Sequence, residues 1–317
     1  MSRAVLILGG AGFVGSHIVE RFVRAGDRVT VLDGLLAGTG GRTENLRAVR
    51  DRIELIAARV EEVGNLAELV ARSEIIIDAM AWTAHRLALR DPLRDLELNA
   101  ASHLHVIRCL APGSGKAVVF LGSRGQYGRA RGGPITEDAP QEPEDVQGTH
   151  KLAAESYYRI YAGLHGFNAV SLRFGNCFGP RQPLEGEDIG LIGGFARELL
   201  AGQTVDIYGA HRRRFLVYAP DVAEVVHQLS SRVPRGFSAF NYAGAAVSVG
   251  ELGQLLAELA GRGSCQLAAM PEELARTDVG DAHFDDTRLR AHLGDLPPSD
   301  LRRALAATLP HLRGEPS

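Results

Sequence analysis

One stretch of sequence decides the fold, Val5-Leu6-Ile7-Leu8-Gly9-Gly10-Ala11-Gly12-Phe13-Val14-Gly15. It leads from an apolar segment, Ala4–Leu8, which predicts a buried strand, into a helical pattern over Ser16–Ala25. Glycines between the two allow a tight turn and let the backbone approach a pyrophosphate closely. The N–H groups and the partial positive charge at the start of the helix attract that anion. We therefore expect a dinucleotide at this turn, in contact with Gly9, Gly12, Phe13, Val14 and Gly15.

An acidic residue, Asp33, follows the next predicted strand, Arg28–Leu32. A carboxylate at the tip of that strand hydrogen-bonds the hydroxyls of the adenosine ribose and repels a 2′-phosphate, which favours NAD over NADP. The glycines fit two spacings, GxGxxG and GxxGxxG, so the turn alone does not choose one dehydrogenase family. The turn and the carboxylate together predict NAD as the cofactor.

Strands and helices alternate along the first half of the chain. Continuous apolar runs predict further buried strands at Ile53–Ile56, Glu74–Asp78, Ala117–Leu121 and Ala169–Phe174. Apolar spacing predicts helices at Gly64–Arg72, Leu96–Leu110 and Gly148–Leu164. This alternation is typical of an α/β fold in which helices cover both faces of a parallel sheet.

The pattern loosens after Phe174 and indicates a smaller lobe, mixed with elements that return to the sheet. The predicted helices there are Ile192–Ala201, Asp221–Ser231, Val249–Ala260 and Asp300–Leu309. The predicted strands are Val205–Tyr208 and Phe215–Tyr218. The second half of the chain is therefore expected to serve both the lobe and the sheet.

Composition and charge narrow the class of protein. The net charge is −3, and the pI of about 6.4 gives no reason to expect nucleic acid or an anionic membrane as a partner. Three scattered cysteines predict neither a disulfide framework nor a metal site. No stretch approaches the ~20 apolar residues of a membrane span, and the first apolar run is too short for a secretory signal. We therefore expect a cytoplasmic protein without metal ligands.

A second group of motifs lies in the middle of the chain. In order, they are Gly122-Ser123, Tyr127-Gly128, Lys151, Arg173-Phe174-Gly175-Asn176-Cys177-Phe178-Gly179-Pro180-Arg181-Gln182, Tyr208-Gly209, Arg214 and Asp221. Together with the glycine turn, they resemble the extended short-chain dehydrogenase/reductases, specifically the nucleotide-sugar epimerase/dehydratase family. The resemblance extends from the first strand to about Asp221 and is weaker beyond it.

The resemblance implies a Rossmann-type doubly wound parallel sheet with a smaller C-terminal substrate-binding lobe. The NAD-binding domain would span residues 1–175, with returning elements at about 213–240, and the lobe would span 176–212 and 241–317. Members of the family usually dimerise by pairing the helix that carries Lys151 with the helix near Leu96–Leu110. The resemblance therefore also implies a homodimer.

The resemblance further implies a reaction and residues for it. Family members usually oxidise a sugar hydroxyl transiently, rearrange the keto-sugar and return the hydride. Ser123 would hydrogen-bond the reacting hydroxyl, and Lys151 would hold the nicotinamide ribose. Asn176 and Arg214 would contact the nucleotide diphosphate. Trp82, on the loop that in this family borders the nicotinamide and the sugar, and Tyr127 would contact the substrate.

The chain departs from the family at the base, which is usually a tyrosine four residues before the lysine. That position holds Gln147, and an amide has no useful pKa for taking a proton from an alcohol. One consequence is a surrogate base: His150 flanks the same helix face, His85 lies on the loop beside the nicotinamide, and Tyr127 is a weaker candidate. Proton transfer by substrate or water is a second consequence, and loss of catalysis is a third.

A further departure concerns the two residues after the serine. Dehydratases of the family carry Asp-Glu there, and the Glu removes a sugar proton. Here Arg124 and Gly125 take those places, which argues against a conventional 4,6-dehydratase. The leading hypothesis is an NAD-dependent epimerase of nucleotide sugars with an atypical proton-transfer residue. A dehydratase or reductase of the same family is one alternative, and a catalytically silent NAD-binding protein is another.

Overall fold

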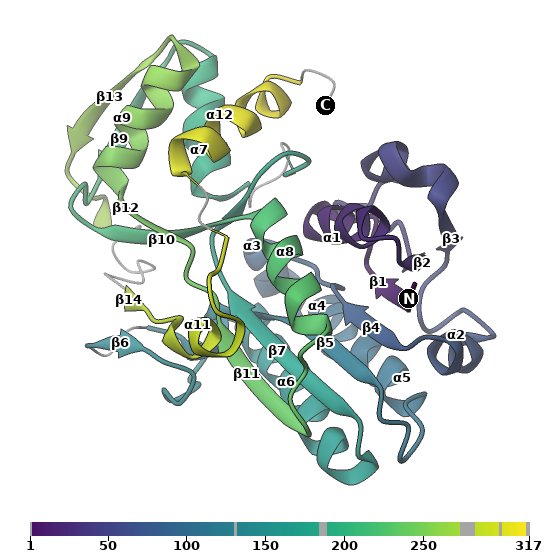
Figure 1. The fold of residues 1–317 in the computed structure, drawn as a ribbon. Helices are drawn as coiled ribbons and strands as arrows, with labels where there is room; N and C mark the ends of the chain where they lie inside the picture. Colours follow the sequence, from purple (N-terminus) through teal and green to yellow (C-terminus); the bar gives the residue numbers. More distant parts are fainter. Residues whose placement is uncertain (1, 130–131, 184–188, 273–282, 298–299, 315–317) are drawn as a thin grey trace.

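The computed structural model describes residues 2–129, 132–183, 189–272, 283–297 and 300–314. Its centre is a parallel sheet of seven strands in the order β11-β7-β5-β4-β1-β2-β3 (Figure 1). The strands are β1 (Ala4–Leu8), β2 (Arg28–Asp33), β3 (Ile53–Ala57), β4 (Ile75–Asp78), β5 (Ala117–Ser123), β7 (Asn168–Phe174) and β11 (Phe237–Asn241). The chain starts in the middle of the sheet and winds to one side and then to the other. The predicted doubly wound α/β class is confirmed.

Helices cover both faces of the sheet, because its strands bury apolar side chains on both sides. On one face lie η1 (Thr43–Arg52), a 3-10 helix, and three α-helices, α1 (Phe13–Arg24), α8 (Ala219–Ser230) and α11 (Thr287–Leu293). On the other face lie α2 (Leu66–Arg72), α5 (Ser102–Arg108) and α6 (Val146–His165). The alternation is clear in β1, where Ile7 joins the first of these cores and Leu6 joins the second.

Residues 96–110, predicted as one helix, are largely helical, but a π-helical turn interrupts the α-helix. Two short helices, α3 (His85–Arg90) and α4 (Pro92–Leu96), lead into a π-helical turn over Glu97–Ala101, and α5 follows. A π turn inserts an extra residue and re-aims the side chains around it, which apolar spacing does not reveal. The turn carries Asn99, a residue of the site described below.

A smaller lobe has its own apolar core and lies at one end of the molecule (Figure 1). Its elements are β8 (Cys177–Phe178), α7 (Gly190–Leu200), β9 (Thr204–Tyr208), β10 (Arg213–Tyr218), β12 (Ala245–Ser248), α9 (Val249–Ala260), β13 (Ser264–Ala268) and α12 (Leu301–Leu312). β10 pairs with β8 and β12, and β9 pairs with β13. A separate short ladder joins β6 (Pro134–Ile135) and β14 (His283–Phe284). The lobe thus contains small sheets of two or three strands, whereas the main sheet is one continuous sheet of seven strands.

Two kinds of feature are absent from the described ranges. In these ranges, no helix combines the length and the apolar content needed to cross a membrane. In the same ranges, no group of three or more His, Cys, Asp or Glu side chains could hold a metal ion. Cys109, Cys177 and Cys265 are free thiols.

The carboxyl ends of the central strands lie along one edge of the sheet. Leu8 is paired with Leu32 on one side and with Asp78 on the other, and Ser123 is paired with Phe174. Ligands of open α/β sheets bind in the crevice outside this edge, where the strand order reverses. The reversal falls at β1, so the glycine turn that follows β1 stands at the centre of the crevice.

Candidate functional site

The glycine turn between β1 and α1 forms a cradle of backbone. Gly9 has φ +70°, a left-handed conformation that glycine adopts without strain. A Cβ added at Gly15 would collide with the carbonyl oxygen of Gly9, so α1 packs this closely only because position 15 is glycine. The helix begins at Phe13, and its N-cap, Gly12, has no side chain to cap the first N–H groups. Those donors are left for a ligand, and an anion suits them.

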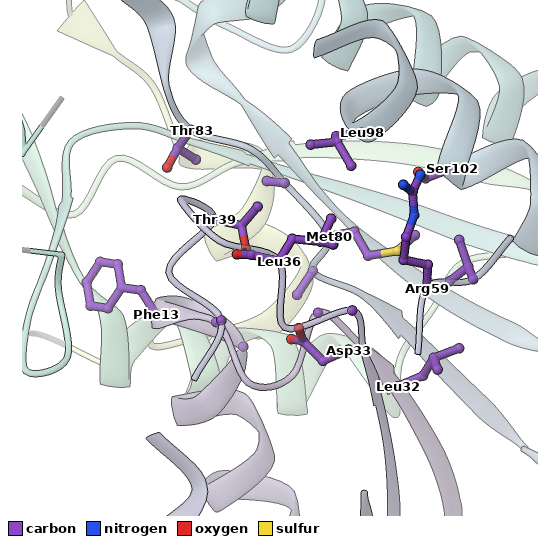
Figure 2. A pocket seen from close by; sticks show the side chains of 18 of the residues that line it. Phe13, Leu32, Asp33, Leu36, Thr39, Arg59, Met80, Thr83, Leu98 and Ser102 are labelled. Atoms are coloured by element: carbon purple, nitrogen blue, oxygen red, sulfur yellow. Dashed lines mark hydrogen bonds between the residues drawn. The ribbon is translucent and has the colours of Figure 1, made fainter. Parts of the chain in front are cut away.

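A cavity lies over this turn, and Figure 2 shows Asp33 and Met80 among the side chains around it. The residues predicted to contact the cofactor, apart from Lys151, all line the cavity: Gly9, Gly12, Phe13, Val14, Gly15 and Asp33. The carboxylate of Asp33 accepts hydrogen bonds from the N–H of Ala11 at 2.8 Å and of Leu35 at 2.9 Å. Burial raises the pKa of Asp33, and the two N–H donors oppose that rise. The carboxylate is thus fixed at the tip of β2 on the cavity wall.

Lys151 lies on α6, and its side chain is buried toward the same crevice. Its Nζ donates to the carbonyl oxygen of Met80 at 3.3 Å and lies 4.4 Å from the ring centroid of Phe120. Burial lowers the pKa of Lys151 to about 8, although the charge of Asp78 and of two further carboxylates opposes the fall. Because Met80 lines the cavity, the lysine ammonium sits directly behind the cavity wall.

Gln147 lies one turn before Lys151 on α6 and is also buried. Its Nε2 donates a hydrogen bond to the carbonyl oxygen of Trp82. Asn99 holds the same residue twice: its Oδ1 accepts from the Trp82 N–H, and its Nδ2 donates to the Trp82 carbonyl, both at 2.9 Å. The glutamine therefore helps to clamp the loop that forms one side of the cavity. The indole Nε1 of Trp82 is buried and has no hydrogen-bond partner among the described residues.

His150 lies next to Lys151 in sequence but takes part in helix packing. Its Nδ1 is 2.6 Å from Oδ1 of Asp95, a fully buried residue of α4. The other oxygen of Asp95 accepts from Nδ2 of Asn99 at 2.9 Å. His150 does not line the cofactor cavity. Sequence reasoning missed Asp95, because nothing in the spacing shows which helix packs against the start of α6.

Ser123 ends β5 and caps the short 3-10 helix Arg124–Tyr127 (η3). Its Oγ accepts from the N–H of Gly125 at 3.0 Å, so the hydroxyl proton is free to donate elsewhere. A Cβ added at Gly125 would lie 3.6 Å from Cα of Gly148. The serine turn therefore packs directly against the first turn of α6, the turn that also carries Gln147.

His85 and Asp145 form a second histidine–carboxylate pair beside this turn. Nδ1 of His85 is 3.6 Å from Oδ2 of Asp145, and both side chains are about half exposed. Asp145 is the N-cap of α6, and its Oδ1 accepts from the N–H of Gly148 at 2.6 Å. Burial raises the pKa of Asp145, but hydrogen bonds from His85 and Gly148 outweigh it and lower the pKa. Sequence reasoning missed Asp145, although an aspartate three residues before Gly148 is an N-cap signal.

The side chain of Tyr127 packs into the protein interior and does not line the cavity. Its hydroxyl donates to Oδ1 of Asn241 at 2.7 Å and accepts from Arg173. Burial raises the pKa of Tyr127 to about 12. Both partners of the hydroxyl are buried residues of the main sheet.

Asn176 and Arg214, predicted to contact a diphosphate, lie on paired elements of the lobe. β8 follows Asn176 and runs parallel to β10, which carries Arg214. Asn176 has φ +46° and donates through Nδ2 to the carbonyl oxygen of Phe215 at 3.1 Å. The pairing places both predicted contacts on the lobe side of the crevice.

Comparison with known proteins gives a second line of evidence, for the family to which the chain belongs. A sequence model of the NAD dependent epimerase/dehydratase family matches residues 5–242. The chain is 29% identical over 321 residues to a UDP-glucose 4-epimerase of Mycolicibacterium smegmatis, and the match covers 98% of each. It is similar to the crystal structure of a Thermotoga maritima UDP-glucose 4-epimerase with UDP-glucose (TM-score 0.85, 26% identity, 98% of each chain). It is also similar to a Thermus thermophilus UDP-glucose 4-epimerase complexed with NAD (TM-score 0.80, 29% identity, 98% and 99% of the two chains).

Proposed function

Because this chain belongs to the NAD dependent epimerase/dehydratase family, we propose that it is an NAD-dependent epimerase of nucleotide sugars. The observation that carries the proposal is the convergence of three features at one sheet edge. The glycine turn follows β1, Ser123 ends β5, and Lys151 donates to a residue of the cavity wall. The similarity to UDP-glucose 4-epimerases supports a nucleotide sugar as the substrate class.

NAD fits the cavity, because the residues present match the chemistry of its parts. The uncapped N–H groups after Gly12 suit the pyrophosphate, and the carboxylate of Asp33 suits the adenosine ribose. Lys151 would hold the nicotinamide ribose from behind Met80. When bound, NAD supplies a reversible two-electron acceptor for the carbon that carries a sugar hydroxyl.

We assign proton transfer to His85, held by Asp145, in place of the family's tyrosine. Gln147 cannot accept a proton, whereas an imidazole beside a carboxylate can do so near neutral pH. Oδ2 of Asp145 is 3.6 Å from Nδ1 of His85 and 4.0 Å from a Cβ built at Gly125, so one carboxylate borders both the imidazole and the Ser123 turn. His150 is less suited, because its ring faces a buried aspartate in the helix packing.

On the lobe side, the nucleotide diphosphate would be held by Asn176 and Arg214. An amide and a guanidinium donate hydrogen bonds that suit phosphate oxygens. Trp82 would lie beside the sugar, because its sequence neighbours Ala81 and Thr83 line the cavity. The reacting hydroxyl would then lie between these groups and the Ser123 turn.

Turnover of a nucleotide-sugar panel tests the proposed function. Purified protein is incubated with NAD and each sugar, and products are separated by chromatography while NADH absorbance is followed. We expect an isomer of unchanged mass with at least one sugar and a transient NADH signal. An absence of product and of NADH across the whole panel would contradict the proposal.

Two matched histidine variants test the assignment of the proton acceptor. His85→Asn removes the titrating ring and should lower kcat by about 10²- to 10⁴-fold, the usual contribution of a general base. His150→Asn also removes a histidine beside an aspartate and should lower kcat far less. Equal losses in the two variants, or a larger loss in His150→Asn, would refute the assignment to His85.

A lyase or reductase of the same family is the first alternative reaction. Loss of water or gain of two hydrogens in the product mass would identify it. Arg124 and Gly125 stand where family dehydratases have Asp-Glu, which disfavours the conventional 4,6-dehydratase.

A catalytically silent NAD-binding protein is the second alternative, and Gln147 is the observation that favours it. Activity that arises only in Gln147→Tyr would identify a silent natural protein.

We also propose that the chain forms a homodimer through the helices around α6. Large apolar side chains are exposed on α3, α4 and α6: Leu89 (68%), Leu93 (76%), Ile160 (50%) and Leu164 (71%). α3 and α4 both contact α6, so these exposed side chains lie on neighbouring helices. Exposed apolar patches of this kind mark surfaces that associate with another protein.

A further inference from the structure

Arg124 follows Ser123 directly and begins the 3-10 helix η3 at the edge of the crevice. Its aliphatic stem lies against Gly175, just after β7: a Cβ added there would be 3.2 Å from Cβ of Arg124 and 3.4 Å from its Cδ. The guanidinium nitrogen Nη2 is buried and has no hydrogen-bond partner within the described part of the chain. A buried donor without a partner costs free energy, so each such group calls for an explanation.

The charged groups that act on Arg124 include a second guanidinium and one carboxylate. Burial lowers the pKa of Arg124, and the positive charge of Arg214 lowers it further, while Asp145 opposes the fall. An arginine keeps its proton even so. Asp145 already faces His85 and accepts from Gly148, so it is shared among several groups. Asp145 is thus not an exclusive counter-ion of Arg124, whose other charged neighbour is a guanidinium.

We propose that Arg124 binds a carboxylate carried by the sugar, so that the preferred substrate is a nucleotide-activated sugar acid. This inference rests on the proposed function and names its substrate class more narrowly. A guanidinium takes a carboxylate through two parallel N–H···O bonds, and Nη2 of Arg124 offers an unused donor for one of them. The carboxylate also supplies a negative charge beyond the two of the diphosphate.

The position of Arg124 favours the sugar over the diphosphate as the source of the anion. Ser123, its neighbour in sequence, is the residue assigned to the reacting sugar hydroxyl. The residues assigned to the diphosphate, Asn176 and Arg214, already supply an amide and a guanidinium for it, although Asn176 directly follows Gly175 and the charge of Arg214 reaches Arg124. A neutral sugar would leave Nη2 buried and unpaired, and a site built to bind a polar group rejects analogues that lack it.

Binding measurements test this inference without requiring turnover. NAD-loaded protein is titrated with UDP-glucuronic acid, UDP-glucose and UDP in a calorimeter. We expect wild-type protein to bind UDP-glucuronic acid at least about tenfold more tightly than UDP-glucose, because one charge-assisted pair is gained. Binding of UDP-glucose without that preference overturns the inference and leaves the proposed function standing. Failure to bind any of the three ligands overturns both.

Two variants of Arg124 locate the contact. Arg124→Met keeps the stem that packs on Gly175 but removes the charge, and it should abolish the preference for the uronic acid. Arg124→Lys keeps the charge but loses the planar fork, so it should retain only part of the preference. Equal weakening of all three ligands in Arg124→Met would assign Arg124 to the diphosphate and overturn the inference. An unchanged preference in both variants would also overturn it.

Discussion

At the scale of single residues, Gln147 places an amide, which cannot take up or release a proton near neutral pH, one turn before Lys151. Its Nε2 donates to the carbonyl of Trp82, which Asn99 also holds, so the glutamine fixes the loop beside the cofactor cavity. An amide at position 147 supplies no titrating group, whereas the neighbouring Lys151 does.

The lowered pKa of Lys151 predicts a pH-dependent stability in the protein without cofactor. Below pH 8 the lysine is charged in both the folded and the unfolded chain. Between about pH 8 and 10.5 only the unfolded chain holds the proton, so a rise in pH stabilises the folded state. Relative to Lys151→Met, the wild-type free energy of unfolding should rise by up to about 3 kcal/mol across that window.

Urea denaturation of both proteins at pH 7, 9 and 10.5 measures this difference. Other titrating groups cancel, because they are common to the two proteins. A difference that stays constant over the three pH values would show that the folded chain does not lower the pKa of Lys151.

For single residues, a sequence pattern does not show which side chains will pair with one another in the folded chain. The residues that line the cavity could be predicted, because the glycine turn after β1 and the carboxylate at the end of the adjacent strand β2 depend on local chain geometry. Asp95 and Asp145 could not be assigned to His150 and His85, because each pair joins segments more than 50 residues apart in sequence. Only the helix-capping position of Asp145 left a local signal.

At the scale of elements, α6 is the helix whose position determines the site, since it carries Gln147 and Lys151. A buried ion pair ties it to β7: Arg173 Nε lies 2.9 Å and Nη2 lies 2.5 Å from the oxygens of Glu155. The same carboxylate accepts from Ser171 at 2.6 Å and from Gln126, next to the Ser123 turn, at 2.8 Å. One carboxylate thus joins α6, β7 and the serine turn.

This pair predicts a large cost for removing one partner. Arg173→Met leaves Glu155 buried without its cation and should lower the free energy of unfolding by about 3–5 kcal/mol. The double variant Arg173→Met/Glu155→Met should be more stable than the single variant, because no unpaired charge is then buried. Chemical denaturation measures both effects.

The control is Arg302→Met, which removes the arginine of an exposed pair with Glu258. Its effect on unfolding should be too small to resolve, because water screens exposed ion pairs. If Arg173→Met is no more costly than this control, the pair does not hold α6 in place.

The central strands could be predicted, since β1, β2, β4, β5 and β7 are short segments, rich in apolar or β-branched residues, that alternate with helices. β11 and β13 could not. β11 has a mixed sequence, Phe-Ser-Ala-Phe-Asn, and becomes a strand by adding to β7 at the edge of the sheet. β13 pairs with β9, a partner about 60 residues earlier in the chain. Such strands depend on long-range pairing more than on their own apolar pattern.

At the scale of the whole molecule, the site is shared between the sheet edge and the lobe. The sheet edge supplies the glycine turn, Asp33 and the Ser123 turn of this candidate site, whereas Asn176 precedes β8 and Arg214 lies on β10. The sequence pattern predicted the sheet and the lobe, but it does not show which element carries the chain back from the lobe to the sheet. That return is made by α8, which packs against α1 on the sheet after the lobe strand β10.

The exposed leucines around α6 predict the assembly state. Leu93 on α4 is 76% exposed, which is costly for a leucine that faces water but favourable in an interface. Leu93→Glu should therefore convert a dimer into a monomer. Leu267→Glu is the matched control, because Leu267 is 78% exposed on β13 in the lobe, away from the proposed interface. Light scattering after size exclusion gives the mass directly. A wild-type monomer at every concentration, or a monomer produced by Leu267→Glu alone, would mean that the helices around α6 do not form the interface.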